Sequence, residues 1–259
     1  MARRRKRRRI NKGRVAALLI IILVIAAGIF FVTTRFGRTS YASVNKSMGE
    51  YMVKANDDLL GKGTDKELKK SLYVPRKIDK TKKLIAFTFD DGPSYIGTNK
   101  LLENLDKYNA RVTFFVLGNR VNNYKDTLKK AYDMGNLIGS HTYSHSNLLK
   151  LDNYEVMNEI RKTNDAIRNI VNSETIYLRP PYGNINANIR EISNMYTILW
   201  NLDTEDWKYK DANRIANYIV ENAHDGAIVL LHDLYETSVD GALLAMERLQ
   251  SEGYAFVTI

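Results

Sequence analysis

The stretch LIAFTFDDGP, residues 84–93, decides the fold of the chain. Its apolar and β-branched residues run without interruption from 84 to 89, which predicts a strand buried on both faces, as in a parallel sheet. The strand ends at two adjacent carboxylates, Asp90 and Asp91. Because α/β folds carry their functional groups where strands end, we expect further functional residues at the ends of the other strands.

Similar apolar runs recur along the chain, separated by segments with the spacing of amphipathic helices. This alternation indicates an α/β fold, either a distorted TIM-like (β/α) barrel of about seven strands or a doubly wound open sheet. The further runs cover residues 112–116, 137–140, 175–178, 196–200, 227–231 and 254–259. The helical segments cover residues 100–108, 124–134, 154–171, 211–223 and 241–251.

The two carboxylates that end the first run are costly beside an apolar strand unless something cationic compensates them. Neighbouring side chains of an extended chain point to opposite sides, so Asp90 and Asp91 could do different jobs. One could bind a metal while the other handles a proton. The Asp-Gly-Pro sequence at 91–93 is also typical of a turn, and this stretch alone does not separate the two interpretations.

Two of the four histidines of the chain, His141 and His145, lie in HTYSH at the end of the third run. Two imidazoles at this spacing on a loop can converge on one cation, and together with a carboxylate they suit Zn²⁺. The pair at a strand end therefore favours a metal site over two structural histidines.

The remaining strand ends also carry reactive residue types. RPPYG, residues 179–183, holds two of the four prolines, so its backbone is stiff, and its arginine can hold a carboxylate. DTEDW, residues 203–207, adds acids and one of the two tryptophans. LLHD, residues 230–233, adds a third histidine. The fourth, His224, precedes a strand and is predicted to be a surface residue.

In this order, TFDDGP, HTYSH, RPPYG, DTEDW and LLH resemble the five motifs of the polysaccharide deacetylase family. That family includes chitin deacetylases, nodulation oligosaccharide deacetylases and bacterial peptidoglycan deacetylases. The resemblance covers residues 83–259, and five motifs in order at predicted strand ends make it specific. It implies a distorted (β/α) barrel and metal-dependent hydrolysis of an N-acetyl group on a sugar.

The resemblance also implies roles for the motif residues. Asp91, His141 and His145 match the metal ligands, and three protein ligands leave positions open for water and substrate. Zn²⁺ is the expected metal, with Co²⁺ as the alternative and Mn²⁺ or Ni²⁺ less suited. Asp90 matches the catalytic base, and Arg179 matches the residue that orients it.

The resemblance implies further residues that protonate the leaving group and hold the acetyl group. His232 matches the catalytic acid, and Asp206 matches its tuning partner. Tyr182 matches the position whose backbone N–H, together with the metal, holds the oxyanion. Trp207 and Leu230 match the walls of a pocket for the acetyl methyl group.

A membrane anchor is predicted at residues 15–34, where VAALLIIILVIAAGIFFV is followed by two threonines. Its first eighteen residues span about 27 Å as a helix, close to the thickness of the hydrocarbon layer. A basic head at residues 1–14 should remain cytoplasmic, which places a polar stem (35–82) and a catalytic domain (83–259) outside the cell. The alternative is a signal peptide cleaved near residues 40–42.

The formal charge of +10 belongs to the first 38 residues, which hold eleven of the 39 basic residues and no acid. Residues 39–259 therefore hold 28 basic and 29 acidic residues. This nearly neutral body argues against a nucleic-acid partner, although a basic nucleic-acid arm is a competing interpretation of the head. The absence of cysteine excludes disulfides, cysteine-ligated metals and thiol nucleophiles.

The expected function is removal of N-acetyl groups from peptidoglycan by a membrane-bound monomer without an obligate protein partner. Chitin oligosaccharides or an exported polysaccharide are the alternative substrates. An inactive wall-binding protein that keeps the fold is the alternative class. The resemblance also leads us to expect a closing helix after the last strand, where the sequence stops at Ile259. Without that helix, either the barrel is open at that seam or the chain is complete as it stands.

Overall fold

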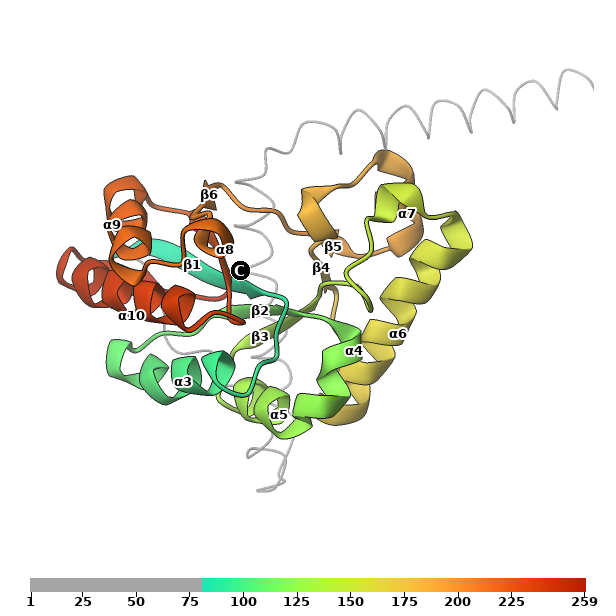
Figure 1. Cartoon of the computed structure of the whole chain (residues 1–259), viewed down its shortest axis with the longest axis horizontal. Helices are drawn as coiled ribbons and strands as arrows, with labels where there is room; N and C mark the ends of the chain where they lie inside the picture. The colour runs from blue at the N-terminus through green and yellow to red at the C-terminus, as the bar shows by residue number, and fades with distance from the viewer. Residues whose placement is uncertain (1–80) are drawn as a thin grey trace, which may run out of the picture. The chain divides into compact units, whose positions relative to one another are not determined.

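The strand that ends in the two carboxylates, β1 (Lys83–Asp90), lies in the middle of a parallel sheet in the computed structural model, which describes residues 81–259 (Figure 1). β2 and β7 pair with its two sides. The order of the strands is β5-β4-β3-β2-β1-β7-β6. The other strands are β2 (Thr113–Val116), β3 (Leu137–Ser140), β4 (Tyr177–Leu178), β5 (Tyr196–Thr197), β6 (Leu202–Asp203), β7 (Ala227–His232) and β8 (Tyr254–Phe256).

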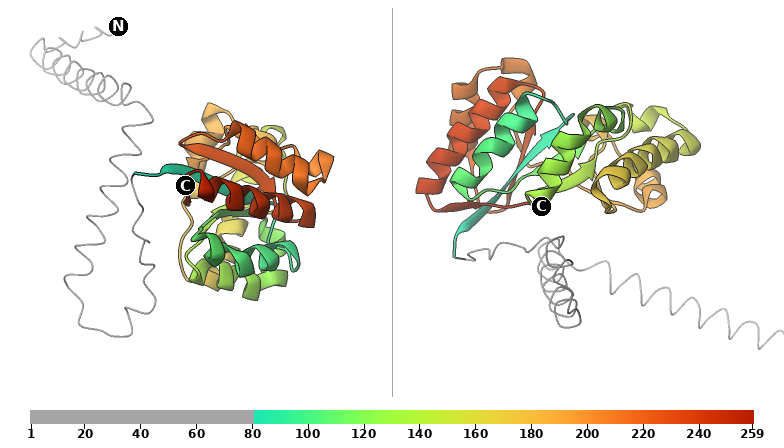
Figure 2. Two further views of the ribbon diagram at one scale, coloured as in Figure 1. Left: turned by 90° about the vertical axis from the view of Figure 1, so that its left-hand side faces the viewer. Right: turned by 90° about the horizontal axis from the view of Figure 1, so that it is seen from below.

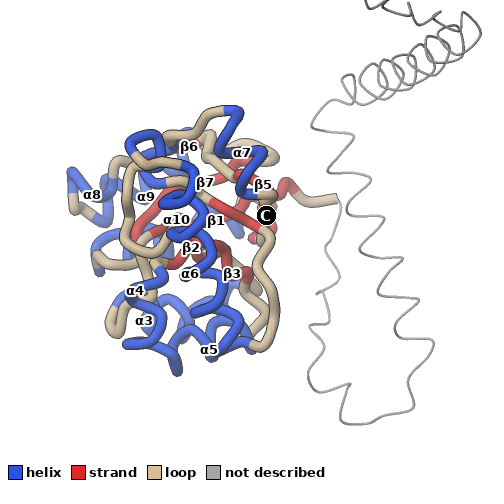
Figure 3. Tube along the Cα trace, turned by 90° about the vertical axis from the view of Figure 1, so that its right-hand side faces the viewer, coloured by secondary structure: helices blue, strands red, loops and turns tan. Residues whose placement is uncertain are grey.

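Helices surround the strands, which curl into an incomplete barrel (Figures 2 and 3). The α-helices are α3 (Gly97–Asn104), α4 (Gly118–Val121), α5 (Lys125–Asp133), α6 (Asn153–Val171), α7 (Ala187–Ser193), α8 (Asp206–Tyr209), α9 (Ala212–Asn222) and α10 (Glu236–Ser251). Short 3₁₀ helices are η2 (Leu105–Tyr108), η3 (Asn122–Tyr124), η4 (Leu148–Lys150) and η5 (Pro181–Gly183). This distorted TIM-like α/β architecture agrees with the predicted fold class.

The side chains of β1 point alternately into two different environments. Ile85, Phe87 and Phe89 are buried in the main hydrophobic cluster together with apolar side chains of the surrounding helices. Thr88 and Asp90 point to the other side, into the barrel, where both contact a buried guanidinium. Because side chains alternate along a strand, the apolar residues fasten β1 to the helices while the polar ones reach the interior.

The barrel is open between β5 and β6, the two edge strands of the sheet. The four residues 198–201 cross this gap, with the N–H of Ile198 donating to Leu178 on one side (2.9 Å) and that of Asn201 to Ile228 on the other (3.1 Å). Of the two alternatives that the sequence left open for the end of the chain, the structure does not show an opening after the last strand, because β8 pairs with the start of β1. The seam therefore lies where strands β5 and β6, both only two residues long, leave each other unpaired.

The apolar runs of the sequence correspond to strands, and all pairings in the sheet are parallel, as the uninterrupted runs indicate. β6 and the helices α4, α7 and α8 were not predicted. Each of these has between two and seven residues. Elements of that length show too little hydrophobic periodicity to be recognised from sequence.

The predicted basic head and membrane anchor lie outside the described residues, as does the stem apart from its last two residues. Within residues 81–259, no helix is both long enough and apolar enough to cross a membrane. The anchor and the cytoplasmic position of the head therefore stay predictions.

Candidate active site

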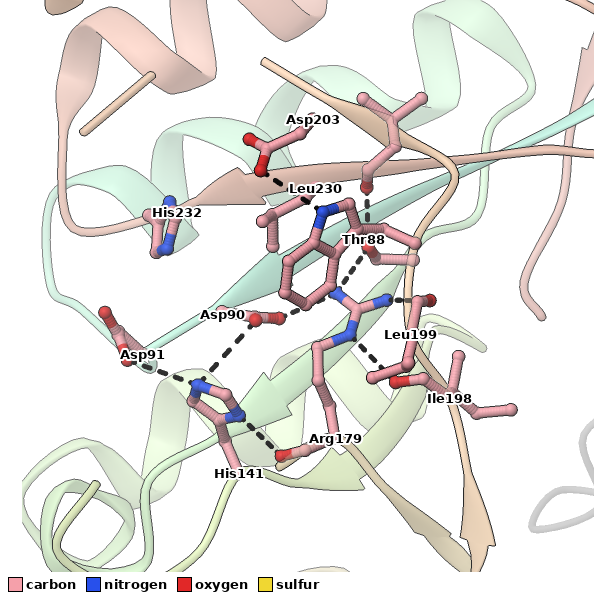
Figure 4. Close-up of polar contacts among 12 residues, drawn as sticks. Thr88, Asp90, Asp91, His141, Arg179, Ile198, Leu199, Asp203, Leu230 and His232 are labelled. Carbon is pink, nitrogen blue, oxygen red and sulfur yellow. Dashed lines mark hydrogen bonds and ion pairs between the residues drawn. The ribbon is translucent and has the colours of Figure 1, made fainter. Parts of the chain in front are cut away.

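Both carboxylates at the end of β1 face the same imidazole. Asp90 Oδ2 lies 3.7 Å from Nε2 of His141, and Asp91 Oδ1 lies 3.6 Å from the same atom (Figure 4). The expectation that neighbouring side chains point to opposite sides is wrong here, because Asp91 has left the strand and adopts a φ of 73°. This left-handed turn brings the second carboxylate back beside the first.

Asp91, His141 and His145 form a group that could hold a metal ion, since one ligand atom from each lies within 4.8 Å of the others. The Nε2 atom of His145 lies 3.5 Å from Asp91 Oδ1. Nδ1 of His141 donates to the backbone carbonyl of Arg179 (2.7 Å), so its Nε2 is free to bind an ion. Such a bond on the far nitrogen is the usual way in which a ligating imidazole is oriented.

Two observations fit these residues to a divalent cation. Oδ1 of Asp91 is buried and has no hydrogen-bond partner among the described residues, which is costly unless a cation compensates it. Burial lowers the pKa of His145, and the nearby His141 acts in the same direction. A metal ligand must be a neutral imidazole, so the environment favours the ligating form. One carboxylate and two imidazoles are a ligand set that suits Zn²⁺.

Arg179 lies inside the barrel with none of its surface exposed. Its Nη1 donates to Asp90 Oδ1 (2.8 Å) and to the hydroxyl of Thr88 (2.7 Å). Its Nε and Nη2 donate to the carbonyls of Ile198 and Leu199 in the segment that crosses the barrel seam (3.2 and 3.1 Å). Asp90 thus lies between Arg179 and His141, held by a charged hydrogen bond on one side (Figure 4).

His232, at the end of β7, is paired with the fully buried Asp206 at the start of α8. Nδ1 of His232 lies 2.8 Å from Asp206 Oδ1, and its backbone N–H donates to Asp206 Oδ2 (2.7 Å). Burial alone lowers the pKa of His232. The hydrogen bond and charge of Asp206, with the charges of Asp90 and Asp91, outweigh burial and raise it to about 9. The imidazole is therefore protonated at neutral pH.

The RPPYG loop forms the helix η5, in which Tyr182 has a φ of 61°. The ring of Tyr182 is largely exposed and stands edge-on to His145, with 4.8 Å between the ring centres. Leu230 is buried on β7 beside His232, whereas the side chain of Trp207 is half exposed. The oxyanion role of Tyr182 and the pocket roles of Leu230 and Trp207 stay predictions.

Trp200, the second tryptophan, was not predicted as a site residue. Its indole lies over the guanidinium of Arg179, 5.7 Å from the ring centre, and donates to Asp203 Oδ2 (3.2 Å). A Cβ added at Gly183 would lie 3.1 Å from the same ring. Trp200 thus covers the arginine and packs against the RPPYG loop. In the sequence, the feature that could have identified Trp200 was its position at the end of the apolar run 196–200.

Asp233 was also not singled out, although it follows His232 directly. It is fully buried, which raises its pKa to about 7. Its Oδ2 accepts a hydrogen bond from the hydroxyl of Thr98, and its backbone carbonyl accepts one from Ser94 (2.7 Å). A side chain at Gly92 would overlap its carboxyl group. Asp233 therefore fastens the loop after Asp91 to the end of β7.

The model of the polysaccharide deacetylase family matches residues 77–198. Peptidoglycan-N-acetylmuramic acid deacetylase PdaC of Bacillus subtilis is 40% identical over 189 residues, which cover 73% of this chain and 40% of that protein. Peptidoglycan-N-acetylglucosamine deacetylase PgdA of Listeria monocytogenes is 41% identical over 180 residues, covering 70% of this chain and 39% of that protein. The solved structure of PdaC superposes with a TM-score of 0.69 at 41% identity, covering 70% of this chain and 90% of that one.

The chain belongs to the polysaccharide deacetylase family. The sequence alignments span about two fifths of the length of these two relatives. A pseudoenzyme of the same family from Bacillus anthracis has a TM-score of 0.65 at 28% identity, and the alignment covers 69% of this chain and 64% of that one. Membership of the family therefore does not by itself establish catalysis, which has to be inferred from the residues of the site.

The electrostatics of the His232–Asp206 pair can be tested in metal-free protein. We expect His232 to titrate with a pKa of about 9, so that the ring is charged at pH 8. Asp206→Asn removes the largest contributions that raise this pKa and leaves burial, which favours the neutral ring, opposed only by the charges of Asp90 and Asp91. The pKa of His232 should then lie well below that of the wild type.

NMR titration of the His232 ring measures this change. Asp203→Asn, the same substitution in an exposed acid three residues earlier in the chain, is the matched control and should leave the His232 titration near 9. An unchanged titration in Asp206→Asn would show that the pair does not set the charge of His232.

Proposed function

We propose that the chain is a divalent-metal-dependent hydrolase that removes N-acetyl groups from the amino sugars of peptidoglycan. The proposal rests on one observation: three functional groups lie close together at the carboxyl ends of β1, β3 and β7. A candidate Asp-His-His metal group adjoins an aspartate held by a buried arginine, and a protonated histidine ends the neighbouring strand. Amide hydrolysis requires these functions together, because the amide is a poor electrophile with a poor leaving group.

Asp91, His141 and His145 would hold the cation, with Zn²⁺ preferred and Co²⁺ as the alternative. When bound, such an ion polarises the amide carbonyl and acidifies water. Asp90 is the base that takes the proton of the attacking water. Its charged hydrogen bond from Arg179 (2.8 Å) aims the carboxylate.

The backbone N–H of Tyr182 donates to the oxyanion of the tetrahedral intermediate. Pro180 and Pro181 precede it and restrict the backbone, so that this donor is set before substrate binds. Trp207 and Leu230 form the walls around the acetyl methyl group. The half-exposed position of Trp207 agrees with a wall that opens to a polymeric substrate.

His232 gives its proton to the departing amine. A pKa of about 9 keeps the ring charged at neutral pH, as an acid requires, and Asp206 holds Nδ1 so that Nε2 is free to donate. A bound cation nearby adds positive charge and lowers this pKa toward the working pH, which improves proton transfer.

Peptidoglycan is the proposed substrate because the relatives PdaC and PgdA are named as peptidoglycan deacetylases. Their names specify different sugars, N-acetylmuramic acid and N-acetylglucosamine, at nearly equal identity to this chain. Chitin oligosaccharides and an exported polysaccharide are the alternative substrates. An inactive wall-binding role is the alternative class, for which the family pseudoenzyme is a precedent.

Acetate release tests the proposed activity. The purified protein should release acetate from intact peptidoglycan faster than from chitin oligomers, and a chelator should abolish the release until Zn²⁺ is restored. Faster release from chitin would change the substrate. No release from either polymer in the metal-loaded protein would favour the inactive class.

The assignment of base and ligand is tested by a matched pair of substitutions at the two neighbouring aspartates. Asp90→Asn should keep its metal while kcat falls about 10²–10⁴-fold, because general base catalysis is lost. Asp91→Asn should weaken metal binding, and excess Zn²⁺ should restore part of its activity. Metal content and acetate release, each measured across a Zn²⁺ titration, separate the two effects. Rescue by metal of Asp90→Asn alone would mean that the roles are exchanged.

We further propose that residues 15–34 anchor the protein in the cell membrane, with the catalytic domain outside and the basic head inside. The full-length protein should then remain with the membrane fraction in 1 M salt, and protease added to wall-stripped cells should digest the domain. Release by salt would contradict the anchor. Protection of the domain from protease would contradict its orientation.

A further inference from the structure

The loop that carries both candidate histidine ligands has an unusual backbone. Thr142 and His145 have φ values of 69° and 61°, in the left-handed region that favours glycine. Side chains with a Cβ adopt this region only when their surroundings hold them there. The contacts that hold the HTYSH loop therefore bear directly on where His141 and His145 point.

The two sides of the loop backbone are held by different elements. The carbonyls of Thr142 and Tyr143 accept hydrogen bonds from the N–H groups of Gly118 and Asn119 at the start of α4 (both 3.0 Å). The N–H groups of Tyr143 and Ser144 both donate to one carboxylate, Glu159 Oε2, at 3.0 and 2.8 Å. The other oxygen, Oε1, accepts from the hydroxyl of Ser144 (2.9 Å).

Glu159 reaches the loop from α6, which is itself fixed in place. Its neighbours on the helix, Val156 and Ile160, are buried in the second hydrophobic cluster. One turn along, Lys162 lies over the ring of Tyr143, 5.4 Å from its centre. The same face of α6 therefore makes both contacts with the loop, and a charged carboxylate makes the stronger kind of hydrogen bond.

We propose that Glu159 is a positioning residue for the metal site: it holds the HTYSH loop in the strained conformation that aims His145 and His141 at Asp91. The two N–H groups that it binds belong to Tyr143 and Ser144, which lie between the two histidines in the chain. The inference rests on the proposed metal-dependent function. If Glu159 is removed, metal binding must itself order the loop, and metal affinity falls.

A purely structural role for Glu159 makes a different prediction. If the three hydrogen bonds only attach the loop to α6, their loss lowers the melting temperature of the metal-free protein and leaves metal affinity unchanged. Metal affinity is therefore the decisive measurement, and it does not depend on catalysis.

The experiment compares the full chain with Glu159→Ala, Glu159→Gln and a control, Asp165→Ala. Asp165 is a carboxylate on the same helix that pairs with Arg168 and makes no hydrogen bond or ion pair with the loop among the described residues. Zn²⁺ affinity is measured by competition with a chromophoric chelator, and Co²⁺ is titrated while its visible absorption reports the ligand geometry. Melting temperatures of the metal-free proteins show that each variant is folded.

Glu159→Ala should bind Zn²⁺ about 10–100-fold more weakly, the usual effect of removing a group that orients metal ligands. Its Co²⁺ absorption should differ from that of the wild type. Glu159→Gln should lose less, because an amide oxygen still accepts from two N–H groups but without charge. Asp165→Ala should match the wild type.

Zn²⁺ affinity of a folded Glu159→Ala within about twofold of the wild type would overturn the proposal. An equal loss in Asp165→Ala would also overturn it, since the effect would belong to the helix in general. If Glu159→Ala does not fold, Glu159→Gln decides, and wild-type affinity in it overturns the proposal. Absence of Zn²⁺ binding by the wild type would overturn the proposed metal-dependent function and this inference together.

Discussion

Arg179 is a charged side chain with no exposed surface, enclosed by a sheet whose two edge strands do not pair. A buried charge is tolerated only when it is paired and its hydrogen bonds are made. Asp90 supplies the opposite charge, Thr88 accepts a further bond, and the carbonyls of the segment across the seam take the rest. Removing one partner of such a pair typically costs about 3–5 kcal/mol.

This one contact links the fold to the chemistry. The same guanidinium that bridges the open side of the barrel holds the proposed base, and the backbone carbonyl of Arg179 orients His141. The barrel opening, the base and a candidate metal ligand are therefore coupled through a single residue. A change at any of them is felt by the others, because a bond lost from the fully buried Arg179 leaves a buried charge without a partner.

The loops at the carboxyl ends of the strands are held by acids that do no proposed chemistry. Asp233 fixes the loop that follows Asp91, and Glu159 binds the loop that carries both histidines. Asp91, which precedes the first of these loops, and Thr142 and His145 in the second have positive φ, which a free loop would not keep. Rigid placement of ligands and bases in the absence of substrate is what gives such sites their precision.

The sequence by itself determined the parallel α/β architecture and the residue types at each strand end, because burial on both faces leaves uninterrupted apolar runs and strand ends share one edge. It did not show that Asp90 and Asp91 turn toward the same imidazole, since that depends on one positive φ. Only the tertiary structure placed the seam between β5 and β6 and brought Trp200, Asp233 and Glu159 to the site. Periodicity reports which face of a local element is buried, whereas these contacts join residues that are neighbours in space and not in the chain.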